Sequence, residues 1–116
     1  MVANEYQKMC LKTASNVAMS STDNLLLQGV MGMCGEAGEA IDIVKKTIFQ
    51  GHPLDEKAKE HLAKEIGDVL WYAATAAYAI GWTFEDVMLM NLNKLSARYK
   101  DGFSPEESLH RKEGDV

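Results

Sequence analysis

Four carboxylates in two evenly spaced pairs are the residues of this sequence best suited to chemistry. Glu36 and Glu39 stand three residues apart, and Glu65 and Asp68 repeat that spacing after 25 intervening residues. Residues three apart share one face of an α-helix. Crowded carboxylates repel unless they take up protons or cations, and oxygen ligands without Cys or His favour Mg²⁺ or Mn²⁺ over zinc. The spacing predicts a divalent-metal site, with solvated surface acids or a structural ionic network as alternatives.

Helices are the elements expected to carry these acids. The chain has only two prolines and no alternating run of β-branched residues, so the sequence predicts an all-α fold without strands. Gly51 and Gly81 are expected to end helices, and Asp55 and Thr83 to begin them. The predicted helices span about residues 3–19, 25–49, 55–80 and 83–100, and the polar residues 101–116 are expected to form a loose C-terminal arm.

The second and third predicted helices each carry an apolar seam with steps of four and three residues. A short connection around His52 makes them antiparallel neighbours, so the sequence predicts a helical hairpin. The seam positions are Val30, Cys34, Ala37, Ile41, Val44 and Ile48 on the second helix, and Leu62, Ile66, Val69, Ala73, Ala76 and Ile80 on the third.

Folding this hairpin at His52 brings the two acidic pairs to the same height. Glu36 then lies level with Asp68, and Glu39 lies level with Glu65. At 1.5 Å per residue the acids stand roughly 20 Å from the turn. The small residues expected to let the backbones approach there are Ala37 and Gly67, and the residues that share the acidic flank are Gly29, Gly32, Ile43 and Tyr72.

A polar stripe on the fourth predicted helix supplies the opposite charge. Asn91, Lys94 and Arg98 follow the i, i+3, i+7 spacing of one helix face. Such a stripe is usually a solvated surface. If it turns toward the acids, it places phosphate-binding cations beside a metal, which is the arrangement that phosphoryl transfer requires.

Composition limits the classes of partner and compartment. The chain has 116 residues, 47% hydrophobic and 25% charged, so we expect one globular domain over residues 1–116 with its core in residues 3–100. The net charge of −5 argues against nucleic acid as a partner. Without an apolar run of about 20 residues or a signal peptide, a cytoplasmic location with no membrane partner is expected. Cys10 and Cys34 are expected to be free thiols.

At this point the residues resemble a known family. The pattern from Glu36 through Glu39 and Glu65 to Asp68 is similar to the E-x-x-E…E-x-x-D signature of the all-α nucleoside triphosphate pyrophosphohydrolases, the MazG-like superfamily. The resemblance covers residues 25–111. Within the family, the chain is similar to the short single-domain proteins of bacteria and phages. The segments that carry it are GEAGEAIDIVKK, FQGHPLD, KEIGDVLWY and NLNKLSARYKDGFS.

The resemblance implies a four-helix bundle that hydrolyses the bond between the α and β phosphates of nucleoside triphosphates with Mg²⁺ or Mn²⁺. The products would be a monophosphate and pyrophosphate, in a house-cleaning role for the nucleotide pool. It also implies a homodimer or homotetramer in which one subunit can complete the site of another. The implied metal ligands and catalytic residues are Glu36, Glu39, Glu65 and Asp68, and the implied substrate contacts are Tyr72, Asn91, Lys94 and Arg98.

Several assignments stay open on sequence alone. Glu36 or Glu39 is the candidate general base. His52 in the turn and His61 one helical turn before Glu65 are expected to be surface residues or residues that support a ligand, and neither is assigned to catalysis. Aromatic residues at helical spacing are more often core than base-stacking. The aromatic candidates for stacking on a base are Phe49, Trp71, Tyr72 and Trp82, and the amides that could read base or sugar edges are Asn16, Gln28 and Asn91.

Two other functions compete with hydrolysis. A carboxylate-bridged di-iron bundle requires Glu-x-x-His pairs, but Glu39 and Asp68 stand where the imidazoles would be. A non-catalytic helical oligomer would use the acids as a solubilising face and the alanine-rich residues 73–79 as its interface. Pyrophosphate release with Mg²⁺ separates this second alternative from the enzyme.

Overall fold

The computed structural model describes residues 1–116 and contains six α-helices with no β-strand. The all-α prediction is confirmed, but the prediction of four helices is wrong. The chain divides into two compact units, Met1–Phe84 and Glu85–Val116; a single domain over the whole chain stays a prediction. No helix is long and apolar enough to cross a membrane. The helices are α1 (Ala3–Lys12), α2 (Asn16–Met19), α3 (Thr22–Phe49), α4 (Glu56–Ala79), α5 (Phe84–Arg98) and α6 (Pro105–Leu109).

Side-chain caps and glycines set the ends of the two long helices. Asp55 caps α4 by accepting a hydrogen bond from the Ala58 amide at 2.9 Å, as predicted. Ser21 caps α3 by accepting from the Asn24 amide at 3.0 Å, so α3 begins at Thr22 rather than at residue 25. Gly51 and Gly81 follow the last residues of α3 and α4 with φ angles of 69° and 81°, which confirms both predicted ends.

The helix predicted over residues 3–19 is divided into α1 and α2. The Thr13 hydroxyl donates to the Cys10 carbonyl at 3.0 Å, and the Ser15 hydroxyl accepts from the Ala18 amide at 3.1 Å. These side chains offer the backbone local partners that compete with a continuous helix. Residues 13–15 therefore form a turn between α1 and α2.

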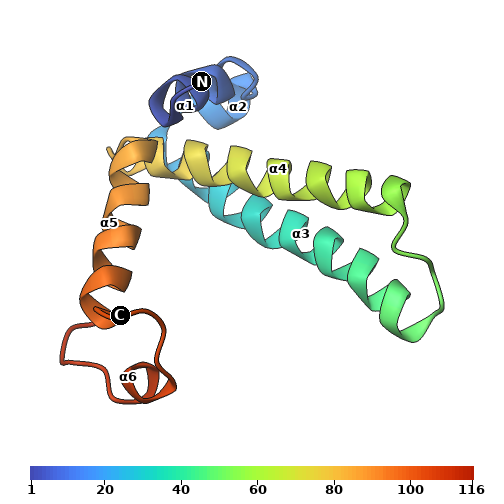
Figure 1. Ribbon diagram of the computed structural model, residues 1–116. Coiled ribbons are helices and arrows are strands. Elements are labelled where there is room, and N and C mark those ends of the chain that lie inside the picture. The colour runs from blue at the N-terminus through green and yellow to red at the C-terminus, as the bar shows by residue number, and fades with distance from the viewer. The chain divides into compact units, whose positions relative to one another are not determined.

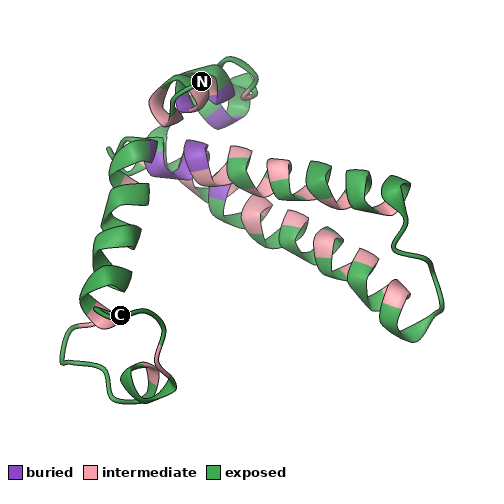
Figure 2. Cartoon of the chain, viewed as in Figure 1, coloured by how far each residue is buried: buried purple, intermediate pink, exposed green.

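Helices α3 and α4 form the predicted antiparallel hairpin (Figure 1). Their buried and half-buried positions follow one line on each helix, which we call the contact stripe and which runs along the facing sides of the hairpin in Figure 2. The contact stripe consists of Leu25, Gly29, Gly32, Glu36, Ile43 and Thr47 of α3, and Ala58, Leu62, Glu65, Val69, Tyr72 and Ala76 of α4.

The predicted seam of α3 does not face α4. Ile41 and Ile48 are 68% and 65% exposed, so the seam prediction on α3 is wrong. On α4 the prediction holds for Leu62, Val69 and Ala76, whereas Ile66 and Ile80 are exposed. The exposed apolar stripe of α3 consists of Val30, Ile41, Val44 and Ile48.

Glycines of α3, not Ala37 and Gly67, allow the close approach of the helices. A Cβ added at Gly29 would lie 2.8 Å from the Ala76 Cβ and 3.0 Å from the Ala76 backbone, and a Cβ at Gly32 would collide with the Tyr72 ring. Gly67 faces open space, so the predicted approach there is wrong. Because Gly32 and Tyr72 are equidistant from His52 in sequence, their contact confirms the predicted register.

A buried glutamine joins α1 to the end of α4. The Gln7 Nε2 donates to the carbonyls of Ala74 and Trp82 at 3.1 and 3.0 Å, and its Oε1 accepts from the Phe84 amide at 3.2 Å. The apolar core surrounds this amide, with Tyr6 stacked on Phe84 at 6.1 Å between ring centroids. The core residues are Cys10, Ala18, Leu25, Ala74, Ala76, Ala77 and Phe84.

The unit of residues 85–116 is held by an ion pair at its C-terminal end. The Arg98 guanidinium binds the Asp115 carboxylate through two hydrogen bonds of 2.8 and 2.7 Å, and this pairing lowers the pKa of Asp115. Residues 101–116 also contain α6, capped by Ser104. Helix α5 ends at Arg98 rather than at residue 100, and the C-terminal arm over residues 101–116 stays a prediction.

The glycine contacts make a stability prediction. Gly29→Ala should destabilise the protein by about 1–3 kcal/mol, because its new methyl group meets the Ala76 backbone. The matched control is Gly38→Ala on the same helix, which has open space and should gain about 0.5–1 kcal/mol of stability. Urea unfolding measures both values, and equal effects in the two variants would contradict the packing described here.

Candidate metal centre

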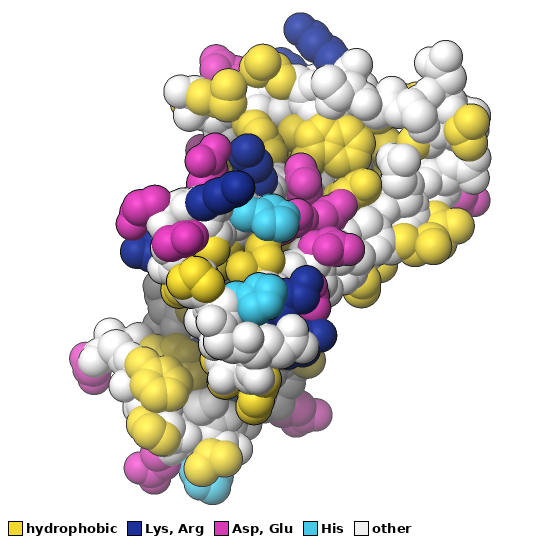
Figure 3. Space-filling model, turned by 90° about the vertical axis from the view of Figure 1, so that its right-hand side faces the viewer, with side chains coloured by type: hydrophobic (Ala, Val, Ile, Leu, Met, Phe, Trp, Pro, Cys, Tyr) yellow, Lys and Arg dark blue, Asp and Glu magenta, His cyan; other side chains and the backbone are white.

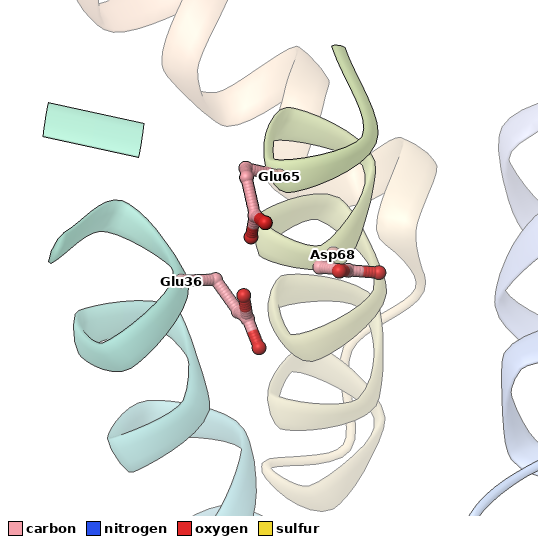
Figure 4. A group of neighbouring side chains, drawn as sticks. All are labelled: Glu36, Glu65 and Asp68. Atoms are coloured by element: carbon pink, nitrogen blue, oxygen red, sulfur yellow. The ribbon is translucent and has the colours of Figure 1, made fainter. Parts of the chain in front are cut away.

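Three of the four predicted acids converge between α3 and α4. Each of Glu36, Glu65 and Asp68 offers one carboxylate oxygen to a group in which these atoms lie within 4.8 Å of one another. Glu36 projects from α3 toward Glu65 and Asp68 on α4 (Figure 4). Figure 3 shows acidic side chains gathered on this side of the protein with an imidazole beside them. The predicted convergence is therefore confirmed for these three residues.

Glu65 is a largely enclosed carboxylate of this group. Its side chain is 14% exposed, and its Oε1 lies 3.1 Å from His61 Nε2. Its Oε2 is buried and receives no hydrogen bond from a donor. A buried carboxylate oxygen without a donor is costly, so Glu65 is short of a positive partner.

The pKa of Glu36 is raised in this negatively charged surrounding. Its pKa is raised first by a hydrogen bond with Glu65, which requires a shared proton, and then by burial. The negative charges of Glu65, Asp68 and Glu39 raise it further. Without a cation, the carboxyl of Glu36 therefore holds its proton to a higher pH than an isolated glutamate does.

No lysine or arginine neutralises the group. Lys45 and Lys46 both bind Asp42 at 2.9 Å and lower its pKa to about 2, and Lys64 binds Glu60 at 3.4 Å. Three carboxylates without a lysine or arginine partner fit a hard divalent ion such as Mg²⁺ or Mn²⁺. The donor set thus supports the predicted cofactor.

Glu39 lies outside this group of oxygens. It lines a cavity of about 720 Å³ near the hairpin turn, together with Asp42, Lys46 and His61. Its charge still acts on the group, since it contributes to the raised pKa of Glu36. A ligand role for Glu39 stays a prediction.

Tyr72 lies beside the acids, as the shared flank predicts. Its ring packs on Gly32 and meets Trp71 edge to face, with centroids 5.0 Å apart. Tyr72 and Glu36 line two cavities of about 610 and 280 Å³, and the smaller one also includes Asp68. Its predicted contact with a substrate therefore has space available.

The three predicted substrate contacts of α5 belong to the other unit. Asn91 and Lys94 are exposed, whereas the Arg98 side chain is 8% exposed and engaged with Asp115. Lys94 and Arg98 line a cavity of about 360 Å³ that includes Arg111. Their action on a substrate stays a prediction.

His61 contacts a candidate ligand, which is one of the two places that the sequence allows for it. Its imidazole is the sole partner of Glu65 among the ion pairs of the structure. The signal was present, because His61 precedes Glu65 by four residues and hence lies on the same face of α4. His61 therefore orients one metal-ligand candidate.

The raised pKa of Glu36 predicts the pH dependence of metal-free stability. A folded pKa above the ordinary value of 4.5 gives stability that is present below that pH and lost as the pH rises through the folded pKa. With a chelator, Glu36→Gln should therefore be more stable than the original protein at neutral pH, and this difference should vanish near pH 4. Thermal unfolding at both pH values measures it.

With added Mg²⁺ or Mn²⁺ at neutral pH, the original protein should instead be more stable than Glu36→Gln. The original protein should gain about 2.7 kcal/mol at a cation concentration one hundred times Kd, and Glu36→Gln much less. Glu60→Gln, an exposed acid of α4 in a surface ion pair, is the control and should behave as the original protein does. Equal responses to cation in all three proteins would contradict a metal centre.

Comparisons with known proteins agree with these observations. The MazG nucleotide pyrophosphohydrolase domain family matches residues 26–103, which include all four acids. The Gene 37 protein of Mycobacterium phage L5 is 37% identical over 73 residues, which cover 62% of this chain and 64% of the phage protein. The match thus spans less than two thirds of that relative, and no solved structure matches the chain. Because the family match covers most of the chain, this protein belongs to the MazG nucleotide pyrophosphohydrolase family.

Proposed function

We propose that this protein is a Mg²⁺-dependent nucleoside triphosphate pyrophosphohydrolase, with Mn²⁺ as an alternative cofactor. Water would attack one of the two phosphorus atoms of the α–β anhydride, the bond from that phosphorus to the bridging oxygen would break, and a monophosphate and pyrophosphate would be released. The observation that carries the proposal is the unneutralised group of Glu36, Glu65 and Asp68 in a chain of this family. A role in clearing unwanted nucleotides from the pool follows from this activity.

Glu36, Glu65 and Asp68 would hold the cation, with Glu39 as a further ligand from the next turn of α3. When bound, the divalent ion supplies charge neutralisation of the triphosphate and a lowered pKa of the attacking water. The protein contributes the fixed positions of the carboxylates, since they project from two helices packed at their glycines.

The side chains around the acids have separate tasks in this proposal. Glu36 or Glu39 would accept the proton of the attacking water, and His61 would keep the Glu65 carboxylate oriented. Tyr72 would border the substrate on the side of the larger cavity. Asn91, Lys94 and Arg98 would contact the phosphates, where Lys94 stabilises the leaving pyrophosphate. Arg98 could do so only after Asp115 releases its guanidinium.

We also propose that the chain assembles as a homodimer or homotetramer. The exposed apolar stripe of α3 supports this, because Val30, Ile41, Val44 and Ile48 follow helical spacing and are 38–68% exposed. An apolar stripe of this length is typical of a face that another helix covers. The stripe equally suits a non-catalytic oligomer, so activity, not assembly, separates the two functions.

The acids make a direct prediction about activity. Asp68→Asn and Glu65→Gln should each lower pyrophosphate release by about a hundredfold or more, because each removes a charged ligand of the cation. The assay uses Mg²⁺ with a panel of canonical and modified nucleoside triphosphates. In ¹⁸O-labelled water, label in the monophosphate identifies attack on the α phosphorus, and label in the pyrophosphate identifies attack on the β phosphorus.

The control for these variants is Glu60→Gln, which lies on the same helix and should keep full activity. Absence of turnover with every nucleotide, together with metal-independent stability, would favour the non-catalytic oligomer.

The exposed apolar stripe predicts the effect of a charge on assembly. Ile41→Lys should shift the protein to smaller species in light scattering coupled to size-exclusion chromatography, because an unpaired ammonium at an apolar interface is costly. Met9→Lys, at an exposed apolar position of α1, is the control and should leave the assembly unchanged. A monomeric original protein would contradict the proposed oligomer.

A further inference from the structure

The cavity of about 610 Å³ beside the acids has a composition unlike that of the metal centre. It lies between α2 and α3, and Glu36 and Tyr72 form its border with the smaller cavity that contains Asp68. Away from that border it is lined by Asn24, Leu27, Gln28 and Met31. Its volume falls within the usual range of small-molecule sites, which is about 300–1,000 Å³.

Gln28 is the unexplained polar group of this cavity. Its Oε1 is buried and has no hydrogen-bond partner. The other glutamine in the interior of this unit, Gln7, binds three backbone groups with the two ends of its amide. Gln28 therefore contributes no comparable structural contact, and the free-energy cost of its unpaired carbonyl calls for a partner from outside the chain.

We propose that this cavity receives the nucleobase of the substrate and that the Gln28 carboxamide binds the edge of the base. This inference rests on the proposed function, since it places the phosphates at the acids and the base at the far side of Glu36. A carboxamide presents an acceptor and a donor side by side, which matches the adjacent N–H and acceptor atoms on the edge of a base.

The surroundings of Gln28 suit a flat heterocycle. Leu27 and Met31 line the same cavity and are exposed, so they offer apolar contact to the faces of a ring. Methionine adapts its shape easily, which favours contact with more than one base. Rotation about the last torsion of glutamine has a broad energy minimum, so the amide can turn its oxygen into the cavity.

The two amides that line this cavity, Asn24 and Gln28, differ in their hydrogen bonds. The Asn24 Nδ2 donates to the Ser20 hydroxyl and to the Val17 carbonyl at 3.0 and 3.2 Å, so that amide is already engaged. The Gln28 Oε1 is the buried amide atom of this cavity that has no partner. The geometry thus assigns base recognition to Gln28 rather than to Asn24.

The test compares nucleotides with a triphosphate that has no base. Gln28→Leu has a similar volume and lacks the amide, so the preference in kcat/KM for nucleoside triphosphates over ribose 5-triphosphate should fall about tenfold. Gln28→Met is a second variant of the same kind. Gln50→Leu, at the exposed C-cap of α3, is the matched control and should keep the preference of the original protein.

Binding without turnover provides an independent measurement. The Kd of a non-hydrolysable α,β-imido nucleoside triphosphate, measured by calorimetry with Mg²⁺, should rise about tenfold in both Gln28 variants. Their unfolding midpoints should not fall, because the Gln28 carbonyl has no partner to lose. This separates loss of recognition from loss of folding.

The outcomes distinguish this inference from the proposed function. Turnover with an unchanged preference in both Gln28 variants, or an equal loss with nucleotides and ribose 5-triphosphate, would overturn base recognition by Gln28 alone. Absence of turnover with every nucleotide would overturn the proposed function, whereas weaker analogue binding in the Gln28 variants would still support the cavity.

Discussion

The contact between α3 and α4 has carboxylates at positions where a helix pair ordinarily places apolar side chains. Glu36 and Glu65 belong to the contact stripe, and they meet across it with one buried oxygen lacking a donor. Charge repulsion there opposes the packing on either side of the acids. The packing at Gly29 and Gly32 therefore has to offset the repulsion between the nearby carboxylates. A divalent cation bound as proposed would change the sign of that local contribution, and its binding would then be coupled to the stability of the hairpin.

The hairpin and its register were predictable from sequence because they depend on local signals. Asp55, Gly51 and Gly81 act through the backbone of their own neighbours, and the equal distances of the acids from His52 follow from chain geometry. The seam of α3 was not predictable in this way. Periodicity identifies apolar stripes but not the surface that covers each, and the glycines of the contact stripe allow a closer approach than the bulkier stripe of Ile41 and Ile48 does.

Other differences arise from interactions that periodicity does not contain. The turn at residues 13–15 depends on the hydroxyls of Thr13 and Ser15, which act on single backbone groups inside an otherwise helical pattern. The pairing of Arg98 with Asp115 joins residues 17 positions apart through the fold of the C-terminal unit. For the site, i and i+3 spacing placed three acids correctly, since it fixes which helix face they share. It could not show which way the Glu39 side chain turns, nor that the Gln28 carbonyl lacks a partner.

The hydrogen bonds of Gln7 couple changes in α1 to the end of α4. One amide near the start of the chain satisfies backbone groups of Ala74, Trp82 and Phe84, which belong to the end of α4 and the beginning of α5. A glutamate at this position would present a second acceptor to two carbonyls, and truncation of α1 would leave all three groups without their partner. Helix α1 thus stabilises the end of α4 through one buried side chain, and Gln7 belongs to the interior of the unit of residues 1–84.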